Sequence, residues 1–240
     1  KFRPKRSYKK IPIKVVNTKP YIEVGISKDS SKAHRKHLMI DTGASHALLL
    51  DNADEETLLP NQSIPSIIGK GLGGNINGYL ARMTYVTVGK FEFLDPIASF
   101  PLEGNYGESI KRGSRNGTLG GELLSRFSVA FDYFNGYIYL KKGRGFSRGF
   151  EHDMSGMGLA ANGEELDMLE VDDVRLNSPA FYAGLRKGDN IKSINGYTLD
   201  TIKFSDFTSL LRMKEGKKIV VKYTREGESY KTSFKLERYI

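Results

Sequence analysis

Residues 38–50 constrain the fold of this chain more than any other stretch, because a polar group separates two apolar runs there. The order is Leu-Met-Ile, then Asp-Thr-Gly-Ala-Ser-His, then Ala-Leu-Leu-Leu. Both apolar runs are typical of buried strands. A carboxylate between buried strands costs free energy unless it finds a partner. Asp41 therefore either caps a turn through its carboxylate or has a chemical role, and the tripeptide alone leaves both possibilities open.

The first part of the chain has the pattern of short strands separated by turn signals. One helix is expected from about Gly121 to Phe127, with its apolar side chains on one side. The dipeptides Asn77-Gly78 and Asn135-Gly136 predict turns. The expected strands are 11–16, 21–26, 37–40, 47–50, 84–88, 91–94, 129–131 and 137–140. Many short strands with one helix favour a mainly β domain, either a barrel or a sandwich.

The pattern changes beyond a basic, glycine-rich segment. Four strands are expected there, at 169–174, 191–194, 219–223 and 230–236, together with helices at 179–185 and 204–213. This is a small α+β module of about 90 residues, a normal domain size. We therefore expect a basic tail or linker at 1–10, a β-rich lobe at 11–143, a linker at 144–152 and a second domain at 153–240.

Composition and charge exclude several kinds of chemistry. The chain has no cysteine, so disulfides, thiolate catalysis and cysteine zinc sites are ruled out. Its formal net charge of +9 would suit a nucleic-acid-binding protein. However, much of the excess is crowded into residues 1–10, where a solvated tail is the simpler explanation. No apolar run approaches the ~20 residues needed to cross a membrane. We therefore expect neither a nucleic-acid partner nor a membrane span.

Three motifs, in order, resemble those of retropepsin-like aspartic proteases over roughly residues 10–143. Residues 38–45 resemble the active-site loop of that family. Residues 117–124 resemble the apolar and glycine segment that leads into its single helix. A third motif resembles the glycine-rich flap hairpin and consists of Gly71, Leu72, Gly73, Gly74, Asn75 and Ile76. The resemblance implies a retropepsin-like (acid protease) β-barrel lobe.

The chemistry implied by this resemblance is peptide hydrolysis by a pair of carboxylates, with no metal and no cofactor. Two carboxylates about 3 Å apart share one proton, and the pair supplies both a general base for water and a general acid for the amide. Asp41 would be one member, Thr42 would hydrogen-bond across to the opposite loop, and Gly43 would allow close backbone approach. The family gives no role to His46. Residues supporting the loop would be Ala44, Ser45, Leu119 and Gly120.

The flap segment has two other interpretations. Gly69–Gly74 satisfies the dinucleotide fingerprint G-x-G-x-x-G, which requires a following helix and an acidic residue about 20 positions on. Residues 75–88 are instead rich in β-forming residues, so we reject a nucleotide site. A mobile hairpin that closes over an extended substrate is the better interpretation. A plain surface loop remains the alternative.

The second carboxylate of the pair is missing from this chain, which contains a single Asp-Thr-Gly. A two-fold axis through two copies could bring two Asp41 side chains together. Alternatively, a second retropepsin-like lobe could precede residue 1, as in related chains that carry two such lobes in tandem. The sequence leaves the choice between a homodimer and an upstream repeat open.

Residues 177–196 contain Ser-Pro-Ala, Ala-Gly-Leu, Gly-Asp and Ile-Asn-Gly in close succession. This run resembles the signature of PDZ domains attached to bacterial proteases. The resemblance implies that a peptide adds as a strand beside the helix expected at 204–213. The terminal carboxylate of that peptide would be held by the loop formed by Gly156, Met157, Gly158 and Leu159, whose N–H groups converge on an anion. A plain glycine-rich turn is an equally good interpretation of this loop.

Together these patterns favour an aspartic endopeptidase whose PDZ module binds or positions a polypeptide substrate. The alternative is a non-catalytic peptide-binding scaffold in which the PDZ module supplies all the function. The protease and PDZ resemblance also implies an extracytoplasmic location, in the periplasm or cell envelope.

Overall fold

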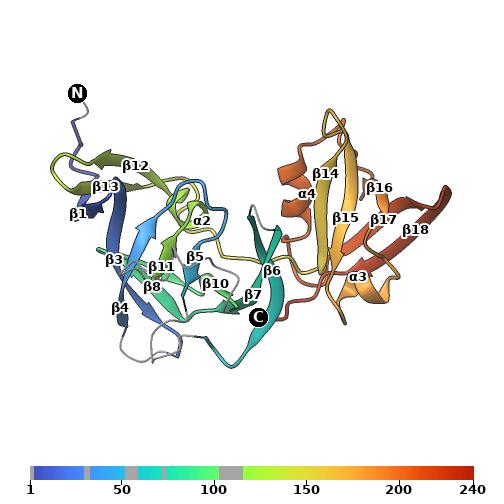
Figure 1. Cartoon of the computed structure of the whole chain (residues 1–240), viewed down its shortest axis with the longest axis horizontal. Coiled ribbons are helices and arrows are strands. Elements are labelled where there is room, and N and C mark those ends of the chain that lie inside the picture. The colour runs from blue at the N-terminus through green and yellow to red at the C-terminus, as the bar shows by residue number, and fades with distance from the viewer. Residues whose placement is uncertain (1–2, 30–32, 52–58, 72–73, 103–115) are drawn as a thin grey trace. The chain divides into compact units, whose positions relative to one another are not determined.

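The polar loop at Asp41 lies in the first of two units into which the chain divides (Figure 1). The computed structural model describes residues 3–29, 33–51, 59–71, 74–102 and 116–240. The first unit comprises Lys1–Phe150 together with Ile240, and the second comprises Glu151–Tyr239. Within the described residues, no helix has the length and apolar character needed to span a membrane.

The first unit is mainly β, as predicted. Its elements are β1 (Lys9–Pro12), β2 (Lys14–Val16), β3 (Lys19–Ser27), β4 (His34–Ile40), β5 (Leu48–Leu50), β6 (Ser63–Gly71), β7 (Gly74–Arg82), β8 (Tyr85–Val88), β9 (Phe91–Leu94), β10 (Ile97–Pro101), β11 (Gly117–Leu119), α2 (Gly121–Leu124), β12 (Phe127–Asp132) and β13 (Tyr137–Lys142).

The strands form one large sheet and one small one. The large sheet has the order β6-β7-β10-β5-β11-β4-β3-β8-β9, and β2 adds to β3. The small sheet has the order β1-β13-β12. A closed barrel needs backbone hydrogen bonds between the first and last strands of a sheet. Among the described residues no ladder joins β6 to β9, so the predicted closed barrel is not seen.

Burial along the strands explains the apolar pattern on both sides of the polar loop. In β3, Ile22, Val24 and Ile26 are buried at every second position, because a pleated strand turns alternate side chains to one face. All three residues of β5, Leu48–Leu50, are buried. This strand lies in the middle of the sheet and is covered on both faces, so its sequence is continuously apolar.

One predicted turn is correct and the other is wrong. Asn135-Gly136 lies in the turn between β12 and β13, where Gly136 adopts a φ of +70°. Asn77-Gly78 instead lies within β7, where Gly78 pairs with Pro101 of β10. A Cβ on Gly78 would lie 2.3 Å from the carbonyl oxygen of Phe100. The glycine there permits close approach of a neighbouring strand, which a local sequence pattern does not distinguish from a turn.

The helix of the first unit is shorter than predicted. It ends at Leu124, and Phe127 already begins β12. Ser125 closes the helix, since its N–H donates to the carbonyl of Gly121 at 2.8 Å and its hydroxyl to that of Glu122 at 3.0 Å. The apolar side chain of Phe127, which extended the helical pattern, packs instead against Phe91, with 4.9 Å between ring centroids.

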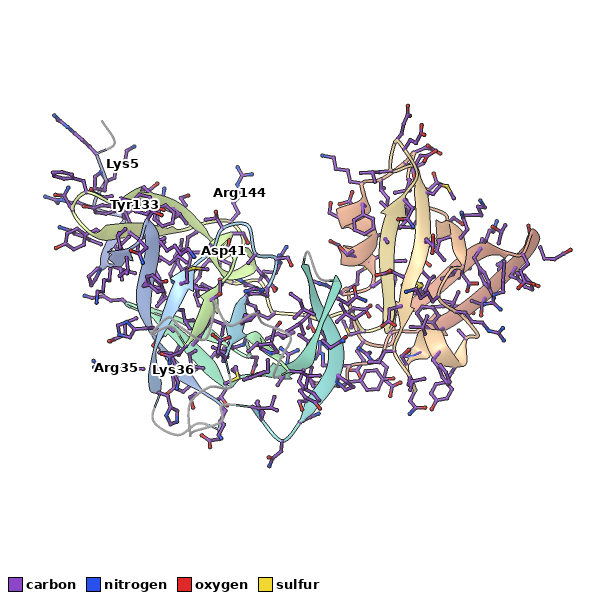
Figure 2. The ribbon with its side chains drawn as sticks, in the orientation of Figure 1. Lys5, Arg35, Lys36, Asp41, Tyr133 and Arg144 are labelled. Atoms are coloured by element: carbon purple, nitrogen blue, oxygen red, sulfur yellow. The ribbon has the colours of Figure 1, made fainter. Side chains whose placement is uncertain are left out.

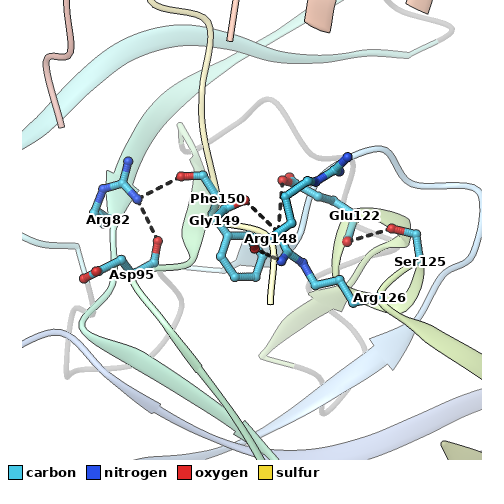
Figure 3. A network of polar contacts seen from close by, with 8 residues as sticks. All are labelled: Arg82, Asp95, Glu122, Ser125, Arg126, Arg148, Gly149 and Phe150. Carbon is cyan, nitrogen blue, oxygen red and sulfur yellow. Dashed lines mark hydrogen bonds and ion pairs between the residues drawn. The ribbon is translucent and has the colours of Figure 1, made fainter. Parts of the chain in front are cut away.

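Arg126 connects this helix end to the segment that the sequence analysis assigns to a linker. Its side chain is almost fully buried, with 2% of its surface exposed. The guanidinium lies 3.5 Å from the ring centroid of Phe150 and donates to the carbonyls of Arg148 and Gly149 (Figure 3). Burial lowers the pKa of Arg126, and the charge of Glu122 opposes that shift. Residues 148–150 therefore pack on the first unit.

The second unit is a five-stranded antiparallel sheet with two short helices. Its elements are β14 (Met157–Asn162), β15 (Met168–Val174), α3 (Pro179–Tyr182), β16 (Asn190–Ile194), α4 (Phe204–Leu210), β17 (Lys218–Arg225) and β18 (Glu228–Lys235). The strand order is β14-β15-β16-β17-β18, so β14 and β18 are the edges. The core includes Met157 from β14, Val171 from β15 and Phe207 from α4.

Local signals in the sequence fix both helix starts. The hydroxyl of Ser178 accepts a hydrogen bond from the N–H of Phe181, and Pro179 occupies the first helical position of α3. In α4, the carboxylate of Asp206 accepts from the N–H of Lys203 at 3.0 Å. The apolar pattern of residues 204–213 continues beyond the helix because Leu211, after its last residue, is also in the core.

A buried ion pair holds the turn before β16. Asp189 is 1% exposed, and its carboxylate accepts from Nε and Nη2 of Arg225 at 2.7 and 2.8 Å. The same carboxylate accepts from the N–H of Arg186 at 2.8 Å. The hydrogen bond that Arg225 donates to Asp189 is the main reason that the pKa of Arg225 is raised. The aspartate of the Gly-Asp dipeptide in the predicted signature, Asp189, therefore has a structural role, because it connects the turn to Arg225 of β17.

Candidate functional site

The first candidate site lies where three strands of the large sheet meet. Strand β11 lies between β4 and β5, parallel to β4 and antiparallel to β5. Since β4 and β5 are consecutive along the chain, the loop of residues 41–47 that joins them passes over the end of β11. Leu119, the last residue of β11, pairs with Ile40 on one side and Leu48 on the other. This topology brings the Asp41 motif against the Leu119 motif, two segments that are far apart in the sequence.

Backbone hydrogen bonds fix the loop on both sides of β11. The N–H of Asp41 donates to the carbonyl of Leu119 at 3.0 Å. The N–H of Gly120 donates to Ala47 at 2.9 Å, and that of Gly121 to Ala44 at 2.7 Å. The first N–H groups of a helix need partners from outside it. Because α2 has no side-chain cap, carbonyls of the Asp41 loop fill that role.

The contact leaves no room for side chains at the start of α2. A Cβ on Gly120 would lie 2.0 Å from the carbonyl oxygen of His46, and a Cβ on Gly121 would lie 2.8 Å from that of Ala44. Both distances are shorter than a non-bonded contact allows. Gly120 and Gly121 are therefore required by close packing of two backbones, a role that the sequence analysis gives to Gly43 alone.

Asp41, labelled in Figure 2, lies in the loop that follows β4. The residue is half-buried. Its Oδ1 accepts a hydrogen bond from the N–H of Gly43 at 2.9 Å, which is the turn-capping role left open by the sequence. Gly43 is the one hydrogen-bond donor to this carboxylate among the described residues. A carboxylate can accept about four hydrogen bonds, so the described residues use a small part of its capacity. Thr42, Gly43 and Ser45 are exposed, so this end of the loop is accessible.

His46 is a neighbour of Asp41 to which the sequence analysis assigns no role. Its Cδ2 lies 2.8 Å from the point where a Cβ of Gly120 would be, so the ring packs against that glycine. Burial lowers the pKa of His46, and the charge of Asp41 opposes the shift. Its Nε2 is buried without a hydrogen-bond partner in the described part of the chain. The site thus includes an imidazole whose charge acts on that of Asp41. The position of His46 directly before the second apolar run was the sequence signal for its burial.

The predicted flap residues lie at the turn of the β6–β7 hairpin. Gly71 pairs with Gly74, Lys70 with Asn75, and Gly69 with Ile76. Gly74 has a φ of +107°, a conformation that favours glycine. Leu72 and Gly73 lie outside the described residues. The hairpin belongs to the same sheet as the Asp41 loop and is connected to β5 through β10.

The second candidate site is the free edge of the sheet in the second unit. Strand β14 pairs with β15 on one side, and its other side has no partner strand among the described residues. Edge strands offer backbone N–H and C=O groups to an added strand. Leu159 on β14, together with Phe204 and Leu210 on α4, packs partly buried against the core. The edge therefore combines free backbone groups with apolar side chains.

The loop before β14 differs from what the sequence predicts. The carboxylate of Asp153 accepts from the N–H of Ser155 at 3.0 Å, from its hydroxyl at 2.6 Å and from the N–H of Gly156 at 2.7 Å. The N–H of Met157 donates to the hydroxyl of Ser155 at 3.0 Å. Of the predicted carboxylate loop, Gly156 and Met157 thus bond within the chain. Gly158 is exposed and Leu159 is half-buried.

Burial raises the pKa of Asp153, against the opposing effects of the hydroxyl and N–H donors and of the Arg175 charge. The segment is also held through its carbonyls, since Ser155 accepts from the N–H of Ala180 and Gly156 from that of Arg175. Asp153 is a residue that the sequence analysis missed. The Asp-x-Ser-Gly order was a possible signal, because aspartate often bonds the backbone two or three residues ahead.

The second unit matches the PDZ domain family model over residues 155–236. Over 131 residues, the chain is 26% identical to the carboxy-terminal processing protease CtpB of Bacillus subtilis (strain 168); the match covers 55% of this chain and 27% of that protein. Among solved structures, the photosystem II D1 C-terminal processing protease matches with a TM-score of 0.31 and 20% identity, over 34% of this chain and 22% of that one. The chain spans about a quarter of the length of these relatives.

The family match and the similarity to CtpB support the PDZ part of the sequence interpretation and a distant similarity to C-terminal processing proteases. They give no support to the retropepsin-like resemblance of residues 10–143, which stays a prediction, as do the catalytic and flap residues assigned from it. Residues 155–236 are a PDZ domain, in a chain that is distantly similar to C-terminal processing proteases.

Proposed function

We propose that this chain is a component of an aspartic-type peptidase, in which Asp41 supplies one of two catalytic carboxylates and the PDZ domain binds polypeptide. The PDZ domain and the distant similarity to processing proteases suggest a peptide-binding or protease-related role. The aspartic mechanism goes beyond that role and is based on the Asp41 loop.

The observation that carries the proposal is the geometry of this loop at the end of β11. Its backbone is fixed by hydrogen bonds to Leu119, Gly120 and Gly121, whereas within the described part of the chain the carboxylate accepts one hydrogen bond, from Gly43. A rigid frame around an unsatisfied functional group is what a preorganised site requires. A carboxylate that only capped a turn would not need two glycines packed against the loop that holds it.

Asp41 can perform only half of the chemistry. In the proposed reaction an ionised carboxylate takes a proton from water as its oxygen attacks the scissile carbonyl. A protonated carboxyl then gives its proton to the departing amide nitrogen. Two carboxyl groups close enough to share one proton provide both forms at once. A second copy of the chain, or a second lobe, would supply the partner of Asp41.

Cleavage of a peptide library tests the proposal. The full chain, Asp41→Asn and the control Asp95→Asn would be incubated with the library between pH 3 and pH 7, and products identified by mass spectrometry. Asp95 is exposed and has a φ of +52°, which asparagine also tolerates, so Asp95→Asn is a matched control. We expect Asp41→Asn to lower the cleavage rate about 100-fold or more, the size of a lost acid–base group. Unchanged cleavage by Asp41→Asn would refute the mechanism.

A peptide-binding scaffold without catalysis is the second candidate, favoured by the match of the PDZ domain. It predicts that the full chain retains peptides from the same library without producing new termini. The decisive sample is one that sediments as a dimer, because a dimer contains two Asp41 side chains. Binding without cleavage in such a dimer favours the scaffold over a homodimeric peptidase.

A further inference from the structure

Two pairs of lysines lie opposite each other on strands β17 and β18. Lys218 pairs with Lys235, and Lys222 pairs with Lys231. Directly opposite residues of an antiparallel ladder share one face of the sheet and have Cβ atoms about 5 Å apart. Like charges in such positions destabilise the pairing of the two strands. This hairpin of the PDZ domain therefore carries two repulsive contacts.

The lysines lie on the solvent face of the hairpin. In β17 the alternate residues Ile219, Val221 and Tyr223 are buried in the core, so the residues between them point away from it. All four lysines are exposed. Both strands are described throughout, and neither places an acidic residue on this face. Its other positions are Val220, Thr224, Ser229 and Ser233.

The four positive charges are not compensated by the domain itself. No ion pair joins any of these lysines to a carboxylate of the described residues. In the same strand, by contrast, Arg225 is paired with Asp189 at 2.7 Å. Four residues along a strand span about 13 Å, which is the separation between the two lysine pairs. The face thus presents a group of four exposed positive charges.

Protection of the sheet edge explains half of this pattern. Lysines on an edge strand discourage another chain from pairing with it. Lys231 and Lys235 are on β18, an edge strand, and suit that purpose. Lys218 and Lys222 are on β17, which lies between β16 and β18 and has no free edge. A charge arrangement that costs stability without protecting an edge indicates an anionic partner that lies across both strands.

The side chains of this face favour an anionic lipid surface over a nucleic acid. Lysine is a compact point charge on a flexible stem, whereas arginine makes bidentate contacts with phosphates and guanine. The face formed by β17 and β18 contains no arginine, and no aromatic ring on which bases could stack. A lipid surface requires neither group, because its negative potential attracts basic residues without a fixed contact geometry.

We propose that the exposed face of β17 and β18 binds the surface of a membrane rich in anionic lipids, through these four lysines. Lipid phosphates would compensate the repulsion within each lysine pair. Strand β14 is at the other edge of the sheet, so the contact leaves the peptide-binding edge open (Figure 1). The inference adds attachment to a membrane surface to the proposed function and does not depend on peptide cleavage.

Sedimentation with lipid vesicles tests the proposal. The full chain would be mixed, at low ionic strength, with vesicles of equal parts phosphatidylglycerol and phosphatidylcholine, and with vesicles of phosphatidylcholine alone. The variant K218Q/K222Q/K231Q/K235Q keeps the side-chain lengths and removes the four charges. We expect its partition into the anionic vesicles to fall at least tenfold below wild type, since each lysine near such a surface contributes about fivefold.

A second variant with the same loss of charge is the matched control. K14Q/K19Q/K90Q/K187Q changes exposed lysines at other places in the chain, and should lower the partition less than about threefold. An equal loss in the two variants would show that net charge alone attracts the chain, and would overturn the proposal. Equal binding of wild type to the two kinds of vesicle would overturn it as well. Tighter binding to a random-sequence DNA duplex, at the same phosphate concentration, would assign the face to a nucleic acid instead.

Thermal unfolding separates a binding role of the lysines from a structural one. Removing the repulsion between the paired lysines should raise the unfolding midpoint of K218Q/K222Q/K231Q/K235Q by about 2 °C. A higher midpoint together with lost vesicle binding is the result expected of a binding face. A lower midpoint, or failure of this variant to fold, would show that the lysines support the fold and would overturn the proposal.

Discussion

Asp41 and Asp153 each lie at a glycine-containing loop, one in each unit, and their carboxylates are in opposite situations. Asp153 accepts three hydrogen bonds, two from Ser155 and one from Gly156. Among the described residues, Asp41 accepts one, from Gly43. The carboxylate of Asp153 organises the loop that carries it. The loop that carries Asp41 is instead organised by other groups, namely the N–H groups of Gly120 and Gly121.

The difference shows how a loop can be held in place without using the hydrogen bonds of its carboxylate, which then remains accessible for other interactions. In the Asp41 loop, backbone carbonyls meet the start of α2, so the loop is held without using the side chain. In the Asp153 loop the side chain itself satisfies the backbone N–H groups. Removing the carboxylate of Asp41 should therefore affect function, and removing that of Asp153 should affect stability.

The largest expected effect comes from crowding the frame of the Asp41 loop. Gly120→Ala would place a Cβ 2.0 Å from the carbonyl oxygen of His46, and backbone must move to relieve the overlap. We expect the free energy of unfolding to fall by about 3 kcal/mol. Scanning calorimetry of the full chain would measure the loss. Gly145→Ala, where no atom lies within 4 Å of the new Cβ, is the control, and an equal loss in both variants would contradict the argument.

The next effect is a difference in the free energy of unfolding between variants that lack one or the other carboxylate. Asp153→Ala leaves the N–H groups of Ser155 and Gly156 without their acceptor, and we expect a loss of about 2 kcal/mol. Asp41→Ala removes one hydrogen bond at an accessible loop and should cost less than about 1 kcal/mol. Hydrogen exchange measured by mass spectrometry would assign each loss to its unit. Equal losses from the two variants would remove the contrast between the loops.

A smaller effect concerns acid sensitivity of the first unit. The pKa of His46 is lowered by burial, so the unfolded chain binds a proton below pH 6.5 that the folded chain resists. The contribution of His46 to the free energy of unfolding is therefore fully present above pH 6.5. It is lost as the pH falls through the lowered pKa of the folded state. Glutamine does not titrate, so we expect His46→Gln to reduce this acid-dependent loss of stability. Urea titrations at several pH values would measure it, and parallel curves for wild type and variant would contradict it.

The smallest effect has the opposite sign and belongs to the second unit. The pKa of Asp153 is raised above 3.8, so the folded chain holds a proton that the unfolded chain has already released. The contribution of protonated Asp153 to the free energy of unfolding is therefore fully present below pH 3.8. It is lost as the pH rises through the raised pKa of the folded state. Asp153→Asn cannot titrate, so its stability relative to wild type should increase over that interval. Hydrogen exchange of residues 153–159, compared at matched intrinsic rates, would detect the change, and a difference that stays constant with pH would contradict it.

Much of the second unit could be predicted from the sequence, because its signals are local. Ser178 and Pro179 begin a helix, Asn195-Gly196 follows a strand, and alternating apolar residues mark β17. The hydrogen bonds of Asp153 could not be predicted in the same way. Whether its carboxylate bonds the amides ahead of it depends on how the loop is held by Ala180 and Arg175, which come from later elements.

In the first unit the failures have the same origin. Asn77-Gly78 has a strong turn pattern, but pairing with β10 keeps it within a strand. Phe127 fits the helix by spacing, but the aromatic contacts with Phe91 and Phe93 place it in β12. In each case a contact with a distant segment outweighs a local preference.

The sequence by itself determined the strand-rich character of the first unit, the PDZ signature and the identity of Asp41 as the residue that needs explanation. These properties follow from alternation, turn chemistry and the cost of a charge between apolar runs. Only the tertiary structure decided that β11 enters between β4 and β5, so that Leu119 and Gly120 meet the Asp41 loop. It also decided that, among the described residues, the carboxylate of Asp153 accepts three hydrogen bonds and that of Asp41 accepts one. The physical reason is that backbone hydrogen bonds between distant segments depend on the whole sheet, whereas local preferences depend only on neighbouring residues.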